Sequence, residues 1–312
     1  MLQPLVSLIG RSHAMRQVIA LARSVAVSPV PAWIVGETGT GKGVLARLIH
    51  QASGRSGRFV ELNSARLDSD LAASTLYGHV RGAFTGAVSD QAGKPEEAEG
   101  GTLFFCEGGR SGHKAQGLML EALDNNGFTR LGSHKVIRPD FRLLFAVSRE
   151  PLELLREGVL DEHFFYRIGA LVLRLPPLRE RSGDIPMLIS TFWHQAASTP
   201  GPEAPFLRDP AIRALFMDYH WPGNVRQLEN VVHAAWICSR GGPVTARLVT
   251  DLMREQPDWP VKRATDVQII RATYESLGRS TRATAKHLGC SESTVRRALR
   301  VERDGDGERP AA

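Results

Sequence analysis

Gly36-Glu37-Thr38-Gly39-Thr40-Gly41-Lys42 lies between an apolar run at residues 32–35 and a helical pattern at residues 44–49. These seven residues match G-x-x-x-x-G-K, and a strand before with a helix after is the context that this phosphate-binding pattern requires. The glycines let backbone N–H groups converge on phosphate oxygens, and Lys42 neutralises their charge beside the helix N-terminus. A glycine-rich turn with an exposed lysine is the alternative, and three glycines in register disfavour it. This P-loop, with Gly43, is therefore predicted to bind ATP.

Five short runs of apolar and β-forming residues lie in the first 181 residues. They span residues 32–35, 59–62, 102–105, 141–147 and 171–175, and helical patterns lie between most of them. This alternation predicts an α/β core with a parallel sheet flanked by helices over residues 1–181. We expect the run at 102–105 to lie beside the strand that precedes the P-loop and to end near the phosphates.

The run at 102–105 continues into Cys106-Glu107. P-loop ATPases place an Asp for Mg²⁺ and a Glu for the attacking water at this point. Glu107 is able to orient water, whereas the sulfur of Cys106 is a poor ligand for a cation that prefers oxygen. Gly43 also differs from the general P-loop pattern, which has Ser or Thr at this position to bind the magnesium ion. ATP and Mg²⁺ are the expected cofactors, and a small buried residue at a strand end is the alternative reading of Cys106.

The three cysteines, Cys106, Cys238 and Cys290, stand far apart and form no metal-ligand pair. We therefore expect the cysteines to form no metal site. We also expect them to remain reduced thiols in a cytoplasmic protein. No apolar run approaches the roughly 18 residues that suggest a membrane span. The P-loop begins at Gly36, so we expect no sensory domain before the α/β core.

The chain changes character after residue 181. Residues 182–255 carry helical patterns and predict a small all-α domain, residues 256–261 form a proline-containing linker, and residues 304–312 are predicted to be disordered. Between Lys262 and Arg303 stand ten Lys or Arg and four Asp or Glu, so this segment accounts for the net charge of +6 of the whole chain. A basic segment beside a neutral body favours nucleic-acid binding over a solvated helix face.

Residues 282–300 within the segment 262–303 have a helix-turn-helix pattern. Ala285 lies on the apolar face of the first helix, Gly289 gives the turn, and Val295 with Leu299 anchors the second helix. A recognition helix presents its N-terminal side chains to base edges and its arginines to phosphates or guanine. The predicted DNA-binding residues are Ser291, Glu292, Ser293, Thr294, Arg296, Arg297 and Arg300. A helical hairpin of purely structural use is the alternative.

Between the P-loop and Cys106 lies the hexapeptide Gly82-Ala83-Phe84-Thr85-Gly86-Ala87. With its flank from Leu76, it resembles the surface-loop motif of sigma-54-dependent transcription activators, the bacterial enhancer-binding proteins, which are AAA+ ATPases. The resemblance runs from about Leu8 to Arg303. Further matching stretches are Gly100 to Phe104, Leu175 to Arg181, Asp184-Ile185-Pro186 and Trp221-Pro222-Gly223-Asn224-Val225-Arg226.

The resemblance implies an AAA+ core, an all-α lid domain and a Fis-type helix-turn-helix. Subunits would form a homo- or hetero-hexameric ring with ATP between neighbours. Hydrolysis would move the hexapeptide, which grips sigma-54 and remodels the closed promoter complex. Phe84 offers contact area, Thr85 a hydrogen bond, and the flanking glycines permit large φ/ψ changes. The expected partners are sigma-54 RNA polymerase and upstream double-stranded DNA, with no membrane partner.

The resemblance also implies roles around the nucleotide. Asn63 is expected to sense the nucleotide and to hold the catalytic Glu107. Arg226 falls on the second sensor of the family. Ser148-Arg149 occupies the first sensor, where the family usually has Thr-Asn, so that role is kept only in part.

The family offers two arginine fingers that reach into the neighbour's site. Arg167 fits the second, and Asp161 stands where the first belongs. A trans arginine is worth about 10³–10⁵ in rate in phosphoryl transfer. Together with Cys106, this leaves open an activator that hydrolyses ATP itself or a hydrolysis-impaired subunit that works in a mixed ring with an intact relative. A DNA-binding repressor that only retains the fold is a third function, and the intact hexapeptide argues against it.

Overall fold

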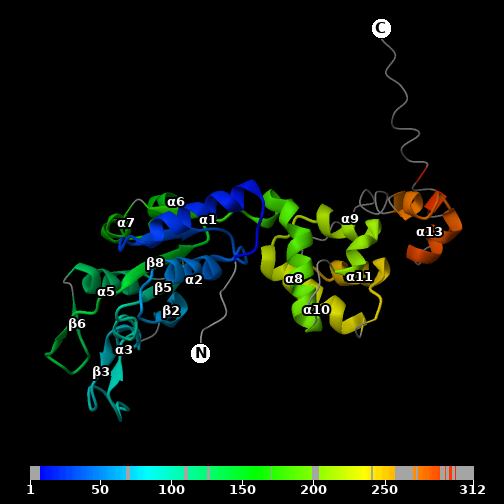
Figure 1. The fold of residues 1–312 in the computed structure, drawn as a ribbon. Helices are drawn as coiled ribbons and strands as arrows, with labels where there is room; N and C mark the ends of the chain where they lie inside the picture. The colour runs from blue at the N-terminus through cyan, green and yellow to red at the C-terminus, as the bar shows by residue number, and fades with distance from the viewer. Residues whose placement is uncertain are drawn as a thin grey trace, which may run out of the picture. The chain divides into compact units, whose positions relative to one another are not determined.

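The computed structural model describes residues 8–67, 71–108, 112–124, 127–169, 171–198, 204–239, 242–256 and 273–288, with residues 270, 271, 292, 295, 296 and 299. The chain forms two compact units, Met1–Pro177 and Leu178–Ala312 (Figure 1). The predicted linker beyond Gln256 and the predicted tail at residues 304–312 lie outside the described residues.

Five strands form the central sheet of the first unit, in the order β2-β5-β8-β1-β9. Each adjacent pair is parallel. The strands overlap the five runs predicted from the sequence, and a parallel sheet flanked by helices is confirmed. Their bounds are Phe59–Asn63 (β2), Thr102–Cys106 (β5), Arg142–Val147 (β8), Ala32–Val35 (β1) and Val172–Arg174 (β9).

Strand β8 lies between β1 and β5, so the expectation that the run at 102–105 lies beside the P-loop strand was wrong. Leu144 of β8 is in register with Ala32 on one side and with Phe104 on the other. Every residue of β8 is buried, and a strand covered on both faces is most stable where both of its edges are also hydrogen-bonded. The order of strands in a sheet depends on such pairing and not on local composition. Because the strands are parallel, β5 and β1 still end at the same edge.

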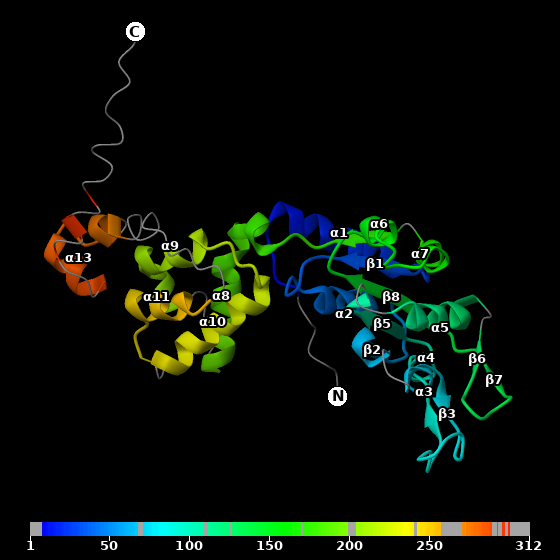
Figure 2. The same ribbon diagram turned by 180° about the vertical axis from the view of Figure 1, so that it is seen from behind.

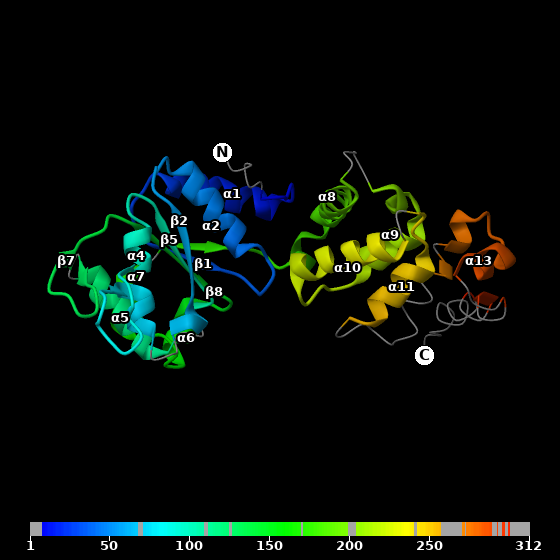
Figure 3. The same cartoon turned by 90° about the horizontal axis from the view of Figure 1, so that it is seen from below.

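Helices cover both faces of this sheet (Figure 3). Helices α1 and α2 pack on one face, against Ile34 and Phe104. Helices α3, α5 and α7 pack on the other, against Trp33 and Phe105. Successive strand residues therefore point into opposite cores. The helices of this unit are α1 (His13–Ala26), α2 (Lys42–Ala52), α3 (Ala72–Tyr77), α4 (Lys94–Glu97), α5 (His113–Asp124), α6 (Pro151–Arg156) and α7 (Glu162–Ile168), with a 3₁₀ turn at Ser64–Leu67.

A buried arginine connects β8 to α1. Arg142, the first residue of β8, is 1% exposed. Its Nη1 donates to the carbonyl of Ala26 at 2.7 Å and its Nη2 to that of Val25 at 2.9 Å. These carbonyls lie in the last turn of α1, and a cation at a helix C-terminus is favourable. Burial lowers the pKa of Arg142, and Arg55 contributes in the same direction.

Two small hairpins extend from the first unit on the same side (Figures 1 and 2). Strands β3 (Gly78–His79) and β4 (Gln91–Ala92) form one, and β6 (Phe128–Thr129) and β7 (Val136–Ile137) form the other. Leu131 joins them, because its N–H donates to Gly78 and its carbonyl accepts from Val80, each at 3.0 Å. The two hairpins are therefore hydrogen-bonded to each other near their bases.

The second unit is helical in its described part. Trp193 of α8 packs edge-on against Trp236 of α10 and against Phe206, and Phe216 stacks on Trp221. These rings fill the core of the predicted all-α domain. The elements are a 3₁₀ segment at Leu178–Asp184, α8 (Ile185–Ala197), a 3₁₀ turn at Pro205–Arg208, α9 (Pro210–Asp218), α10 (Asn224–Ser239), α11 (Ala246–Arg254) and α13 (Thr281–Leu288).

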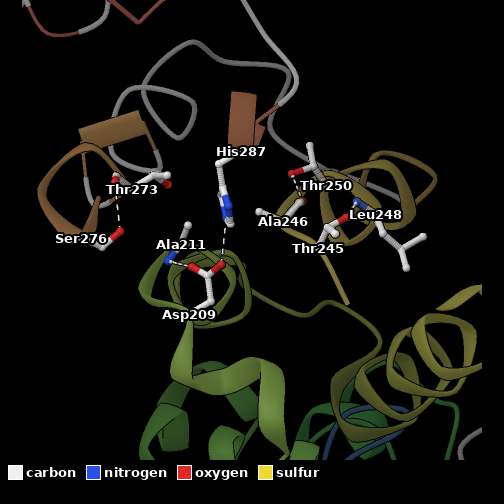
Figure 4. Close-up of polar contacts among 9 residues, drawn as sticks. All are labelled: Asp209, Ala211, Thr245, Ala246, Leu248, Thr250, Thr273, Ser276 and His287. Carbon is white, nitrogen blue, oxygen red and sulfur yellow. Dashed lines mark hydrogen bonds and ion pairs between the residues drawn. The ribbon is translucent and has the colours of Figure 1, made fainter. Parts of the chain in front are cut away.

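Asp209 caps α9 and also contacts α13 (Figure 4). Its Oδ1 accepts from the N–H of Ala211 at 2.9 Å, and its Oδ2 lies 2.9 Å from Nε2 of His287. Helix α11 begins at its own side-chain cap, Thr245, which accepts from the N–H of Leu248. None of the helices in the described ranges has the length and apolar character needed to span a membrane.

Candidate functional site

The P-loop begins directly after β1 and leads into the first turn of α2. Gly39 (φ 83°) and Gly41 (φ 106°) occupy the left-handed region of backbone space, which side chains disfavour. Gly41 is the N-cap of α2, and no side chain caps this helix. An N-terminus without a side-chain cap leaves its first N–H groups to an anion.

Lys42 lies within the loop. Its Nζ donates to the carbonyls of Gly36 at 2.5 Å and Glu37 at 3.1 Å. The hydroxyl of the buried Thr40 donates to the same Glu37 carbonyl at 2.8 Å. These bonds hold a tight loop in which the lysine charge and the α2 N-terminus lie together, as phosphate binding requires.

Asn63 ends β2 and Glu107 follows β5 at the carboxyl edge of the sheet, where the two strands are neighbours. Asn63 is in register with Cys106, the residue before Glu107. Glu107 is exposed and has a φ of 59°, a conformation that costs a non-glycine residue about 1 kcal/mol or more. The hydroxyl of Ser64 donates to the Glu107 carbonyl at 2.7 Å and holds this peptide. The catalytic roles of Asn63 and Glu107 remain predictions.

Cys106 is half-buried at the end of β5. Burial, together with the nearby carboxylates of Glu61 and Glu107, raises the pKa of its thiol to about 11. The thiol therefore stays protonated near neutral pH, whereas metals bind the thiolate. Glu61, which had no signal in the sequence, also pairs with Arg47 of α2 at 3.1 Å.

The donor set at the end of β5 and the start of α2 does not fit Mg²⁺. This ion takes oxygen ligands in octahedral geometry. Gly43 has no side chain, and Cys106 presents sulfur where an Asp belongs. Within the described ranges, no group of three His, Cys, Asp or Glu side chains is arranged to hold a metal ion.

The hexapeptide forms the tip of the β3–β4 hairpin. Gly82 (φ 82°) and Gly86 (φ 102°) are left-handed, and a Cβ at either position would meet no atom within 4 Å. The N–H of Gly82 donates to Ala87 at 2.9 Å, and that of Ala87 to Phe84 at 3.0 Å. Phe84 is 37% exposed and Thr85 is exposed. The loop is therefore closed on itself and presents Phe84 and Thr85 outward, while its glycines carry the unusual backbone angles.

His79 supports this loop from below. Its ring packs edge-on against Phe84 with centroids 5.0 Å apart, and its Nδ1 lies 2.8 Å from the hydroxyl of Ser74. His79 is buried, as is Ser74 of α3. A lone histidine in a strand gave no signal of this contact in the sequence. The orientation of Phe84 thus depends on a buried hydrogen bond at the base of the hairpin.

Residues 8–174 match the family described as "Sigma-54 interaction domain". The chain belongs to this family. Residues 179–265 of the chain match a second family, "AAA+ ATPase lid domain". The AAA+ core and lid domain expected from the resemblance are therefore supported by independent stretches of the chain.

Curated relatives agree with this assignment. The protein is 38% identical over 299 residues to a formate hydrogenlyase transcriptional activator of Salmonella typhimurium, with 92% of this chain and 43% of the relative covered. It is 40% identical over 226 residues to the transcriptional regulator NtrC of Azospirillum brasilense, with 72% and 47% covered. It is 34% identical over 315 residues to the regulatory protein LuxO of Vibrio vulnificus, with 94% and 68% covered. The chain thus spans less than half the length of the first two.

A solved structure of NtrX from Brucella abortus in complex with ADP has the same fold. Its TM-score is 0.70 at 28% identity, and the match covers 95% of this chain and 69% of that one. A structure of NtrX in complex with ATP gives a TM-score of 0.69.

Asp161, which replaces an arginine finger in the family pattern, is the N-cap of α7. Its carboxylate accepts from the N–H of Phe164 at 3.0 Å, and its own N–H donates to Oε1 of Gln116 at 2.8 Å. An Asp followed by Glu162 and an apolar run is an N-cap signal that was present in the sequence. Arg167 lies at the other end of the same helix and donates to the carbonyl of Leu123 at 2.6 Å. Its role as a finger remains a prediction.

The two sensor positions lie in different units. Arg149, after β8, forms a bidentate pair with Glu157. This hydrogen bonding raises the pKa of Arg149 and lowers that of Glu157. Arg226 is exposed in the first turns of α10. The nearby Asn224 (φ 53°) is fully buried, and its Oδ1 accepts from the N–H of Leu178 at 2.8 Å. The Trp221–Arg226 motif therefore has a structural role in addition to its predicted sensor.

The predicted DNA-binding segment is described in part. Val295 and Ala285 are buried with Ile270 in one apolar cluster, with Leu299 packed against it. Arg296 is exposed and pairs with Glu292 at 3.2 Å. Five predicted DNA contacts, Ser291, Ser293, Thr294, Arg297 and Arg300, lie outside the described residues.

Proposed function

We propose that this member of the sigma-54 interaction domain family is a cytoplasmic, ATP-dependent activator that binds upstream DNA and opens promoters held by sigma-54 RNA polymerase. The observation that carries the proposal is the complete hexapeptide Gly82–Ala87 at the tip of a hairpin that leaves an α/β core with a P-loop. Transcriptional regulators among its relatives and the nucleotide complexes of NtrX support it.

The loop is built to make contact and to move. Phe84 offers an aromatic surface and Thr85 a hydroxyl, both at the exposed tip. Gly82 and Gly86 flank this tip with no atom within 4 Å of an added Cβ, and glycine tolerates large changes of φ and ψ. The bonds of Leu131 to Gly78 and Val80 tie the base to the β6–β7 hairpin, so a shift of one hairpin is transmitted to the other.

The proposal also includes a hexameric ring whose C-terminal segment, residues 262–303, binds DNA. The cluster of Ala285, Val295 and Ile270 is consistent with a helix-turn-helix core. The local excess of Lys and Arg between Lys262 and Arg303 supplies the charge that phosphates attract. Among the described residues, Arg296 is the exposed arginine whose substitution would test the predicted DNA contact.

The test is promoter opening by sigma-54 RNA polymerase in a purified system. Thr85→Ala and Phe84→Ala should each abolish open-complex formation and weaken sigma-54 binding. Val88→Ala is the matched control, because Val88 is 80% exposed and lies just outside the hexapeptide. If Thr85→Ala leaves both sigma-54 binding and opening intact, the proposal is wrong.

A hydrolysis-impaired subunit of a mixed ring is the second candidate. Cys106 weakens the pocket of its own chain, and Asp161 removes a finger from the pocket of the neighbour. A homo-hexamer would have both defects at every interface, whereas an intact relative in the ring would dilute them. ATPase rates of the purified protein, alone and mixed with such a relative, separate the two: a rate typical of intact relatives from the chain alone excludes this candidate. Cys106→Asp with Asp161→Arg should raise the rate per folded molecule.

A further inference from the structure

The two positions that supply Mg²⁺ ligands in P-loop enzymes lie close together here without an oxygen. Gly43 is in the first turn of α2, and a Cβ there would meet only Cε1 of Phe104, at 3.7 Å. Cys106 follows Phe104 by two residues on β5, so its side chain lies on the same α2-facing side of the sheet. No steric reason excludes a serine at position 43, yet the chain has none.

The neighbouring carboxylates are committed elsewhere. Glu61 is held by Arg47 at 3.1 Å, and Arg47 in turn lies 4.5 Å above the ring of Phe59. Glu61 sits opposite Phe104 in the β2–β5 ladder, two residues short of the strand end. Its carboxylate is therefore held both by Arg47 and by a hydrogen bond with the Cys106 thiol. Glu107 is the residue predicted to orient the attacking water.

The loop itself carries positive charge for the phosphates. Lys42 lies inside the P-loop, and the N-terminus of α2 has no side-chain cap. Amide donors and a lysine bind phosphate oxygens with no metal between them. The P-loop thus retains its direct phosphate contacts, whereas positions 43 and 106 offer no oxygen to a magnesium ion.

We propose that the P-loop amides and Lys42 hold the phosphates of the nucleotide without a magnesium ligand from this chain, so that nucleotide affinity does not depend on Mg²⁺. The inference rests on the proposed function, since it assumes that the P-loop binds a nucleotide. Gly43 and Cys106, which replace the usual magnesium ligands, then share one consequence. Nucleotide binding no longer requires the metal, and this is separate from any loss of hydrolysis.

The test measures ADP binding by calorimetry, in excess MgCl₂ and in excess EDTA, so that no turnover enters the readout. In the unaltered protein, the two dissociation constants should agree within about fivefold, a difference below 1 kcal/mol. Cys106→Asp should bind ADP about tenfold more tightly with MgCl₂ than with EDTA, the scale of one added contact to a charged group. Cys238→Ser is the matched thiol control, because Cys238 is exposed in α10, and it should behave as the unaltered protein.

Gly43→Ser is a second gain variant that the space around position 43 accommodates. It should also acquire a preference for MgCl₂, which keeps the test valid if Cys106→Asp does not fold. A gain larger than about fivefold on adding MgCl₂ to the unaltered protein overturns the inference. So does the absence of any magnesium preference in both folded gain variants. Failure to bind ADP in either buffer overturns the proposed function itself, and this inference with it.

Discussion

Replacing Asp161 by Arg, the change that would restore a second arginine finger, is expected to destabilise the first unit. The carboxylate of Asp161 caps α7 through the N–H of Phe164, and loss of an Asp N-cap costs about 1 kcal/mol. A cation at the same end also opposes the helix dipole, which adds about 0.3–1 kcal/mol. Helix α7 buries Phe164 and Ile168 in the core, so fraying of its first turn is transmitted to the sheet. The total is about 1.5 kcal/mol.

Urea and thermal denaturation of the full chain test this estimate. A loss of 1 kcal/mol lowers Tm by about 2–4 °C in a domain of 150–250 residues. Asp161→Ala should lose only the cap, about 1 kcal/mol, and Asp161→Asn should stay close to the unaltered protein because Asn is an equally good N-cap. If Asp161→Arg is as stable as the unaltered protein, or Asp161→Asn loses as much as Asp161→Ala, the cap does not explain this residue.

Three further outcomes are expected. Asn224→Ala should lower the free energy of unfolding, measured by urea titration, by about 2–3 kcal/mol. It leaves the N–H of Leu178 unsatisfied and forces alanine into a left-handed φ. Asn224→Asp should recover most of this loss in the same titration. The rate at which iodoacetamide alkylates Cys106, followed by mass spectrometry, should rise steeply only as the pH approaches the raised thiol pKa of about 11. The reason is that the thiolate is the reactive form. Fast labelling at neutral pH contradicts the burial of this thiol. Arg142→Met should cost about 2 kcal/mol by removing two hydrogen bonds from a charged donor, with Arg142→Lys intermediate in the same thermal denaturation.

Local patterns in the sequence predicted the strands and the P-loop well. The run at 32–35 coincides with β1, and Gly39 and Gly41 have the left-handed angles that a phosphate-binding turn requires. Both depend on interactions within a few residues, where alternation and glycine placement carry the information.

Features that depend on distant partners were not predictable in this way. The position of β8 between β1 and β5 follows from pairing across the whole sheet. Glu61 lies beside Cys106 only because β2 and β5 are adjacent, and His79 supports Phe84 only because the hairpin returns over it. The family pattern presents Asp161 as a missing arginine, although the sequence also carries an N-cap signal at this residue. A single residue can lose one role and serve another, and only its contacts in the folded chain distinguish the two.

Arg142 has a consequence for how the sheet assembles. Side chains in a strand alternate between faces, so sliding β8 by one residue would turn this guanidinium away from the end of α1 and bury its charge without a partner. The apolar residues that follow, Leu143 to Val147, are buried on both faces and discriminate far less between registers. One charged residue at the start of the strand therefore favours the native register of β8 over a register shifted by one residue, and with it the alignment of the strand end that leads into Ser148-Arg149.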